Sequence, residues 1–120
     1  MKATDLRIGN YLNGKQGHVV VTEIRTNNSV KIEDNTSIFD VGTCLIAIPT
    51  TTEWLLKLGF TYNESSSLYE KRGYDVDIVD GEYCHFYLPE FGDWYQDTEY
   101  IHQLQNLYFA LTWEELKLEL

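Results

Sequence analysis

Short β-branched runs that end in turn-forming residues fill the first 48 positions of the chain. Residues 19–24, Val-Val-Val-Thr-Glu-Ile, precede the turn-forming residues Thr-Asn-Asn-Ser, and residues 30–33 are followed by Asp-Asn-Thr-Ser. Val, Ile and Thr favour strands, whereas Asn, Asp, Gly and Ser favour turns. Further short strands are expected at 38–39 and 45–48. Strands this short and this closely spaced predict a β-meander or a small open barrel.

The second part of the chain contains two helical patterns. The first is short: Thr50 or Thr51 is placed to cap it, Glu53 completes a Thr-x-x-Glu box, and Gly59 ends it in a left-handed turn. The second covers residues 98–111, where apolar side chains recur every three or four positions. We therefore expect one short and one long helix.

The remaining segments of the second part are expected to be turns and strands. Residues 112–115 predict a turn, and residues 116–120, where leucine alternates with charged residues, predict a terminal strand. A hairpin is expected around Asp80 and Gly81, with a three-residue loop at 79–81 and the glycine in a left-handed bulge. This register pairs Val76 with Cys84 and Tyr74 with Phe86 on an apolar face, and Asp75 with His85 and Asp77 with Tyr83 on the opposite face.

These elements predict an α+β fold. A β-meander lobe, residues 1–48, is expected to pack against an acidic α+β lobe, residues 49–120, made of a helix, an antiparallel hairpin, a helix and a terminal strand. A chain of 120 residues is long enough for one domain. We therefore expect the two lobes to form one compact unit.

Charge is distributed unequally between the two halves. Residues 1–60 contain six basic and six acidic residues, whereas residues 61–120 contain three basic and thirteen acidic residues, so the whole net charge of −10 belongs to the second half. Such a field repels polyanions and attracts basic surfaces. The balance argues against direct binding to nucleic acid and favours a basic protein partner, although an acidic surface also serves solubility alone.

The sequence also bears on the compartment. It has no stretch of about 18 apolar residues, as a membrane span requires, and its first residues lack the apolar core of a secretion signal. We expect a protein of the bacterial cytoplasm that does not bind membranes. Cys44 and Cys84, which lie in apolar, strand-like surroundings, are then expected to be buried free thiols, because neither has the spacing of a zinc site and the cytoplasm is reducing.

Three stretches of the sequence resemble a known family. They are Leu-Arg-Ile-Gly-Asn-Tyr at 6–11, Ile-Pro-Thr-Thr-Thr-Glu-Trp-Leu-Leu-Lys-Leu-Gly-Phe at 48–60, and Tyr-Ile-His-Gln-Leu-Gln-Asn-Leu-Tyr-Phe-Ala-Leu-Thr at 100–112. Together they resemble small proteins of Bacteroidetes genomes, prophages and phages, a family with no established activity. Trp113 stands where that family usually has glycine. The resemblance implies a setting in a mobile element and supplies no catalytic residue.

Two groups of residues suggest chemistry, and each has a simpler explanation. Asp75 and His85 could form an acid-base dyad across the hairpin, but the sequence places no nucleophile beside them. The alternating carboxylates of Asp75, Asp77, Asp80 and Glu82 could hold a metal, but they lack the order of a calcium-binding loop and fit a solvated strand face. We therefore expect no enzyme activity, no metal and no cofactor.

The polar side of the long helix is a third candidate. His102, Gln103, Gln105 and Asn106 give it more amides than solubility requires. Gln103 and Asn106 could bond to loop carbonyls around the helix, which is the structural interpretation, or the amides could hold a neutral polar ligand. The first interpretation is favoured because three-residue spacing places the two amides on one side of the helix.

The loop before this helix combines aromatic and acidic residues. Its aromatic side chains either grip a basic partner beside the carboxylates or turn inward and cover the core, and the nine tyrosines of the chain favour the second arrangement. The candidate partner-binding residues are Glu90, Phe91, Asp93, Trp94, Tyr95, Asp97 and Glu99.

Taken together, these features predict a non-catalytic, phage-type accessory protein that binds a basic protein partner through its acidic, aromatic C-terminal half. A role in counter-defence or host takeover fits that setting. The alternative is a small-molecule-sequestering protein with a nucleotide-like ligand, which Asp75, His85, His102, Gln103 and Asn106 would contact. The protein is expected to be a monomer, or a homodimer joined through the terminal strand.

Overall fold

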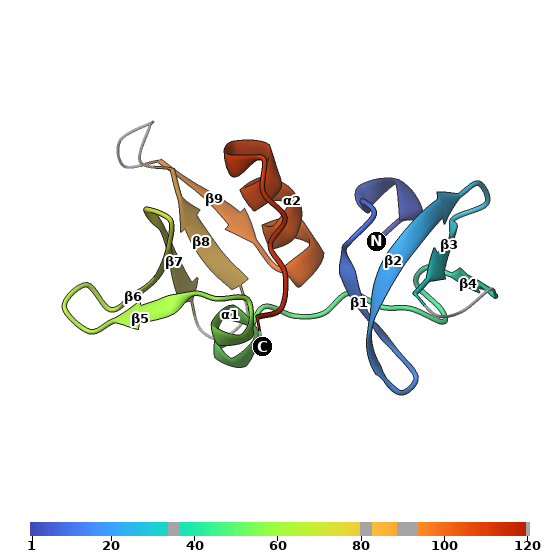
Figure 1. Cartoon of the computed structure of the whole chain (residues 1–120), viewed down its shortest axis with the longest axis horizontal. Coiled ribbons are helices and arrows are strands. Elements are labelled where there is room, and N and C mark those ends of the chain that lie inside the picture. The colour runs from blue at the N-terminus through green and yellow to red at the C-terminus, as the bar shows by residue number, and fades with distance from the viewer. Residues whose placement is uncertain (34–36, 80–82, 89–93, 120) are drawn as a thin grey trace. The chain divides into compact units, whose positions relative to one another are not determined.

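The computed structural model describes residues 1–33, 37–79, 83–88 and 94–119 (Figure 1). It consists of two antiparallel sheets, one long helix and one short helix, so the predicted α+β class with open sheets is confirmed. The chain divides into two compact units. Unit 1 contains Met1–Ile48 and Ile101–Glu115, and unit 2 contains Pro49–Tyr100 and Leu116–Leu120. The long helix thus groups with the first 48 residues.

Unit 1 is a four-stranded sheet with a short 3-10 turn and the long helix. The sheet has the order β1-β2-β3-β4, and every neighbouring pair is antiparallel. One cluster of buried apolar side chains in unit 1 is formed by the 3-10 turn, the strands and the segment after β4, and this cluster includes Leu12, Val21 and Leu45. The elements are the 3-10 turn Ala3–Asp5, β1 (Tyr11–Gly14), β2 (Gly17–Arg25), β3 (Ser29–Ile32), β4 (Ile38–Asp40) and α2 (Ile101–Thr112).

The strands predicted at 19–24, 30–33 and 38–39 are confirmed in this sheet, whereas the strand predicted at 45–48 is wrong. Leu45 and Ile46 form only isolated bridges, to Val41 and Asn13 respectively. The two residues face different neighbours, because Gly42, with a φ of 95°, turns the chain between Val41 and Leu45. An apolar run therefore lies here without a continuous strand partner.

Unit 2 is a five-stranded antiparallel sheet with the short helix. Its order is β5-β6-β7-β8-β9, so the chain runs through the sheet as a meander. The elements are α1 (Thr52–Lys57), β5 (Thr61–Asn63), β6 (Leu68–Lys71), β7 (Tyr74–Val79), β8 (Tyr83–Tyr87) and β9 (Tyr95–Thr98).

Helix α1 ends where the sequence predicts, and it is capped by Thr51, one of the two threonines predicted to cap it. Glu53 is then the second residue of the helix, so it does not complete the predicted Thr-x-x-Glu box, which needs a glutamate at the third position. The Thr51 hydroxyl accepts a hydrogen bond from the Trp54 amide, which satisfies one of the unpaired amides of the first turn. Gly59 has a φ of 92°, and the amide of Phe60 donates back to the carbonyl of Leu55 at 3.0 Å. Phe60 is then buried, as expected for the apolar residue after a left-handed stop.

The hairpin of β7 and β8 has a different register from the predicted one. The structure pairs Asp77 with His85 and Val79 with Tyr83, so the connecting residues are 80–82, which lie outside the described residues. Asp75 is therefore not opposite His85. The shift is two residues, and such a shift leaves every side chain on its predicted face. Because the apolar pattern is the same in both registers, that pattern could not distinguish them.

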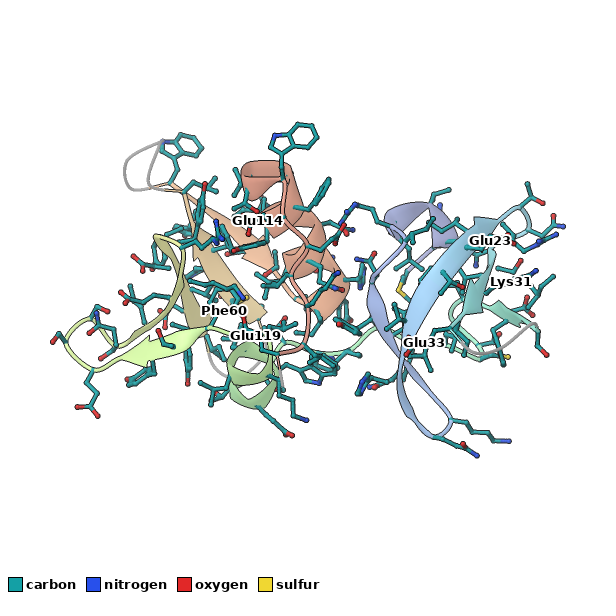
Figure 2. All side chains as sticks on the ribbon, in the orientation of Figure 1. Glu23, Lys31, Glu33, Phe60, Glu114 and Glu119 are labelled. Atoms are coloured by element: carbon teal, nitrogen blue, oxygen red, sulfur yellow. The ribbon has the colours of Figure 1, made fainter. Side chains whose placement is uncertain are left out.

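Two further expectations are corrected near the C-terminus. Helix α2 begins at Ile101, not at residue 98, because Thr98 belongs to β9 and Tyr100 forms a bridge with Pro49. The terminal strand is not formed by residues 116–119. Instead, the amide of Glu119 donates to the carbonyl of Lys57 at the end of α1, next to which Figure 2 shows Glu119. The strand expected to join a homodimer is therefore absent from the described residues.

Candidate functional site

One face of the unit 2 sheet gathers acidic residues, tyrosines and a histidine. Side chains alternate along β7 and β8: Tyr74, Val76, Cys84 and Phe86 are buried on one face, and the residues between them point to the other. Cross-strand pairing extends this second face to β6 and β9. We call it the acidic tyrosine face, and it consists of Glu70, Asp75, Asp77, Tyr83, His85, Tyr87, Tyr95 and Asp97.

His85 lies at the centre of the acidic tyrosine face. Its Nδ1 lies 2.5 Å from Oδ1 of Asp97, its partner on β9, and the Nδ1–H donates to that carboxylate. Its ring centroid lies 4.1 Å from that of Tyr95, 5.6 Å from that of Tyr83 and 6.3 Å from that of Tyr87. The contacts fix the imidazole between three aromatic rings and leave the Asp97 side chain exposed.

The described strands place no lysine or arginine on this face. Lys71 is the one lysine or arginine within the described residues of the strands β5 to β9, and its pairing with Tyr74 places it on the opposite face. There its Nζ bonds to Glu119 and to the carbonyl of Leu58. Partial burial raises the pKa of Asp75, and the nearby charge of Glu70 raises it further. The described strands therefore give this face four carboxylates and one histidine, which is bonded to Asp97.

The pKa of Tyr87 is affected by the same carboxylates. Its pKa is raised by partial burial, and the carboxylates of Asp77 and Asp75 and the phenol of Tyr95 add to the effect. The ring centroids of Tyr87 and Tyr95 lie 5.8 Å apart. Tyr87 thus stays neutral at physiological pH, and both tyrosines present aromatic rings beside carboxylates.

The aromatic residues at the start of β9 are exposed. Trp94 is 73% exposed and Tyr95 is 48% exposed, so the expectation that they turn inward as a cover for the core is wrong. The strand explains this outcome, because cross-strand pairing with Tyr87 holds Tyr95 on the outer face of the sheet. Glu99 is exposed as well. Glu90, Phe91 and Asp93 lie outside the described residues.

Among the residues that the structure describes, the contacts of His85 include no serine, threonine or cysteine nucleophile. Asp97, not Asp75, is bonded to His85, and Cys84 is on the buried face with its Sγ 2.9 Å from the hydroxyl of Thr98. Cys44, which was expected to be buried as well, is exposed. Burial raises the pKa of the Cys84 thiol, despite the hydrogen bond with Thr98 that lowers it. A thiol of this kind is a poor nucleophile.

Within the described residues, no group of three or more His, Cys, Asp or Glu side chains could hold a metal ion. Asp80 and Glu82, the other two members of the predicted carboxylate cluster, lie outside those residues.

The polar side of α2 holds the helix to the rest of unit 1. Gln105 is fully buried: its Oε1 accepts from the amide of Tyr11 at 2.9 Å, and its Nε2 donates to the carbonyl of Gly9 at 3.1 Å. Asn106 accepts from the side chain of Asn10 and donates to the carbonyl of Asp5. The side-chain amides of Gln105 and Asn106 thus bond to groups of unit 1, as the structural interpretation requires, although Gln105 has the role that was expected of Gln103. His102 is buried nearby on the same helix.

Five of the residues on the acidic tyrosine face were singled out in the sequence as candidates for chemistry or binding: Asp75, Asp77, His85, Tyr95 and Asp97. Tyr83 was placed on the correct face but given no role, and Tyr87 was missed, although its alternation with His85 on one strand was a usable signal. Comparisons of the chain with family models, with curated proteins and with solved structures gave no match. No helix in the described part of the chain is long and apolar enough to cross a membrane.

Proposed function

We propose that this protein is a non-catalytic binding protein that holds a basic protein partner on the acidic tyrosine face. The observation that carries the proposal is the grouping of three tyrosines and a histidine with four carboxylates on one sheet face, where the described strands supply no lysine or arginine. Lysine and arginine side chains bind such a surface through apolar contact, cation-π attraction and charge pairing together.

The geometry favours arginine- and lysine-rich segments. The rings of Tyr87 and Tyr95 supply faces for a cation, while the exposed carboxylate of Asp97 lies beside them. A cation docked here would also relieve the repulsion between Asp75 and Glu70. Attraction of opposite charges speeds association and makes the affinity depend on salt.

The proposal also includes the biological setting of the protein. The resemblance to prophage proteins suggests a phage-type accessory factor in the cytoplasm of a bacterial host, with a role in counter-defence or host takeover. The partner would then be a basic host or phage protein.

The test uses a fluorescently labelled peptide of alternating arginine, lysine and glycine, with the matching glutamate and aspartate peptide as a negative probe. The double variant Tyr95→Ala, Asp97→Asn should weaken binding of the basic peptide about tenfold, since one cation-π contact and one charge pair are lost. Raising NaCl from 50 to 300 mM should weaken the wild-type complex further.

The matched control is the double variant Tyr62→Ala, Glu53→Gln. Tyr62 is 49% exposed, nearly the same as Tyr95, but it lies on the other face of the sheet, and Glu53 is exposed on α1. This variant should keep wild-type affinity. Equal loss in both double variants would show non-specific attraction to an acidic protein and would overturn the proposed site.

A further inference from the structure

Unit 1 contains an apolar groove of about 750 Å³, and every residue known to line it belongs to unit 1. It lies at the turn between β1 and β2 and extends along the sheet toward β4. Its floor is formed by Val19, Ile32, Phe39, Leu45 and Ile46. Pockets of this volume are typical of sites for small ligands.

Part of the groove floor is open to solvent, whereas Ile32 and Leu45 are buried. Ile46 is 54% exposed, and Val19 and Phe39 are only partly buried against the core of unit 1. Gly14 helps to keep the space open, because a methyl group built on it would lie 3.4 Å from Leu45 Cδ2 and 3.5 Å from Val19 Cγ1. Binding of an apolar molecule over this open apolar surface lowers the free energy, because it removes the surface from water.

The rim of the groove is polar, and its one charge among the described lining residues is positive. Lys15 is exposed and forms no ion pair with any residue that the structure describes. Gln16 and Thr43 add hydrogen-bonding groups to the rim, and none of the described lining residues is acidic.

We propose that this groove binds an amphipathic monoanion, a molecule with an apolar body and one carboxylate or sulfonate. The apolar body covers Val19, Phe39 and Ile46, while the anionic group pairs with Lys15 at the rim. The site is separate from the acidic tyrosine face, which belongs to unit 2 and carries the opposite charge, so either proposal can fail without the other.

Two fluorescent probes separate the charge contribution from the apolar one. The anionic probe is 1-anilinonaphthalene-8-sulfonate, and N-phenyl-1-naphthylamine is the same ring system without the sulfonate. Lys15→Gln should weaken binding of the sulfonate about two- to fivefold, the range of an exposed ion pair, and leave the neutral probe unchanged. Lys117→Gln, which removes an exposed lysine of unit 2, should change neither.

A charge series at Ile46 gives a second measurement. Because this side chain is more than half exposed, Ile46→Lys, Ile46→Gln and Ile46→Glu should all fold, as cooperative thermal unfolding would verify. Affinity for the sulfonate should fall in that order, while the neutral probe should bind the three variants alike. Equal affinities for the sulfonate across the series would overturn the proposal.

Cys44 reports occupancy directly. It lines the groove and is exposed, whereas Cys84 is fully buried, so a thiol reagent such as 5,5′-dithiobis(2-nitrobenzoate) modifies Cys44 selectively in the folded protein. The naphthalene sulfonate at saturating concentration should slow this modification several-fold in the wild type. An unchanged rate would place the probe elsewhere and refute the site.

Discussion

At the scale of the residue, Trp113 combines a large side chain with a backbone conformation that favours glycine. It follows the last residue of α2 with a φ of 62°, the left-handed conformation that glycine adopts most easily, and its side chain is 82% exposed. The amide of Trp113 still donates to the carbonyl of Phe109 at 2.8 Å. The ring of Trp113 touches that of Phe109, with 5.8 Å between centroids, and the guanidinium of Arg7 covers the Phe109 ring at 4.0 Å.

Trp113→Gly should therefore stabilise the protein. Relief of the left-handed backbone contributes about 1 kcal/mol, and loss of the edge contact with Phe109 offsets roughly half of it. The net expectation is a rise of about 0.5 kcal/mol in the free energy of unfolding, measured by urea denaturation with circular dichroism. Trp113→Ala is the control, because it removes the ring and keeps the strained backbone. A glycine variant no more stable than the alanine variant would contradict this account.

At the scale of the element, α2 is held in unit 1 by hydrogen bonds between residues far apart in the sequence. Gln105 satisfies the amide of Tyr11 and the carbonyl of Gly9, and it also accepts from the side chain of Asn10 at 3.3 Å. Asn10 and Gln105 are both completely buried. A buried polar network of this kind stabilises only while every member keeps its partner.

Gln105→Leu should lower the free energy of unfolding by about 2–4 kcal/mol, because a side chain of similar size leaves buried donors and an acceptor without partners. Gln103→Leu, at an exposed position of the same helix, should change it by less than about 0.5 kcal/mol. The comparison is made by thermal and urea unfolding of both variants. Similar losses in the two variants would mean that the buried network does not hold α2 in place.

Elements with local signals were predicted well, and elements fixed by distant contacts were not. The cap at Thr51 and the left-handed Gly59 lie within α1 or next to it, so the sequence alone defines that helix. The register of β7 and β8 depends on a loop whose two options keep the same side chains on each face. Residues 116–119 alternate like a strand, but the position of Glu119 is determined by contacts with Lys57 and Lys71, which lie far earlier in the sequence.

The same distinction holds for the candidate site. Asp75 and His85 were expected to meet, and they do share one face of the sheet, because alternation along a strand is a local property. The actual partner of His85 is Asp97, which only the pairing of β8 with β9 brings near. The groove in unit 1 had no signal in the sequence, since its lining comes from several strands and a turn.

At the scale of the whole molecule, two groups make stability depend on pH in opposite directions. The folded pKa of Asp75 is raised, so its contribution to stability is full below the ordinary value of 3.8 and is lost as pH rises through the raised value. Burial lowers the pKa of His102 in the folded protein, and the Asp5 carboxylate opposes this effect only in part. The unfolded chain, with a histidine pKa near 6.5, then binds the proton more tightly than the folded protein does.

The free energy of unfolding should therefore fall as pH drops from 6.5 toward the lowered pKa of His102, with a slope from this group of up to about 1.4 kcal/mol per pH unit. His102→Gln removes the group, so its stability curve should fall less steeply than that of the wild type between pH 6.5 and 5. Above pH 7 the two curves should run parallel, because His102 is neutral in both states there, and any offset measures packing alone. Urea unfolding at half-unit steps from pH 5 to 8 gives both curves. Curves that stay parallel down to pH 5 would show that protonation of His102 does not oppose folding.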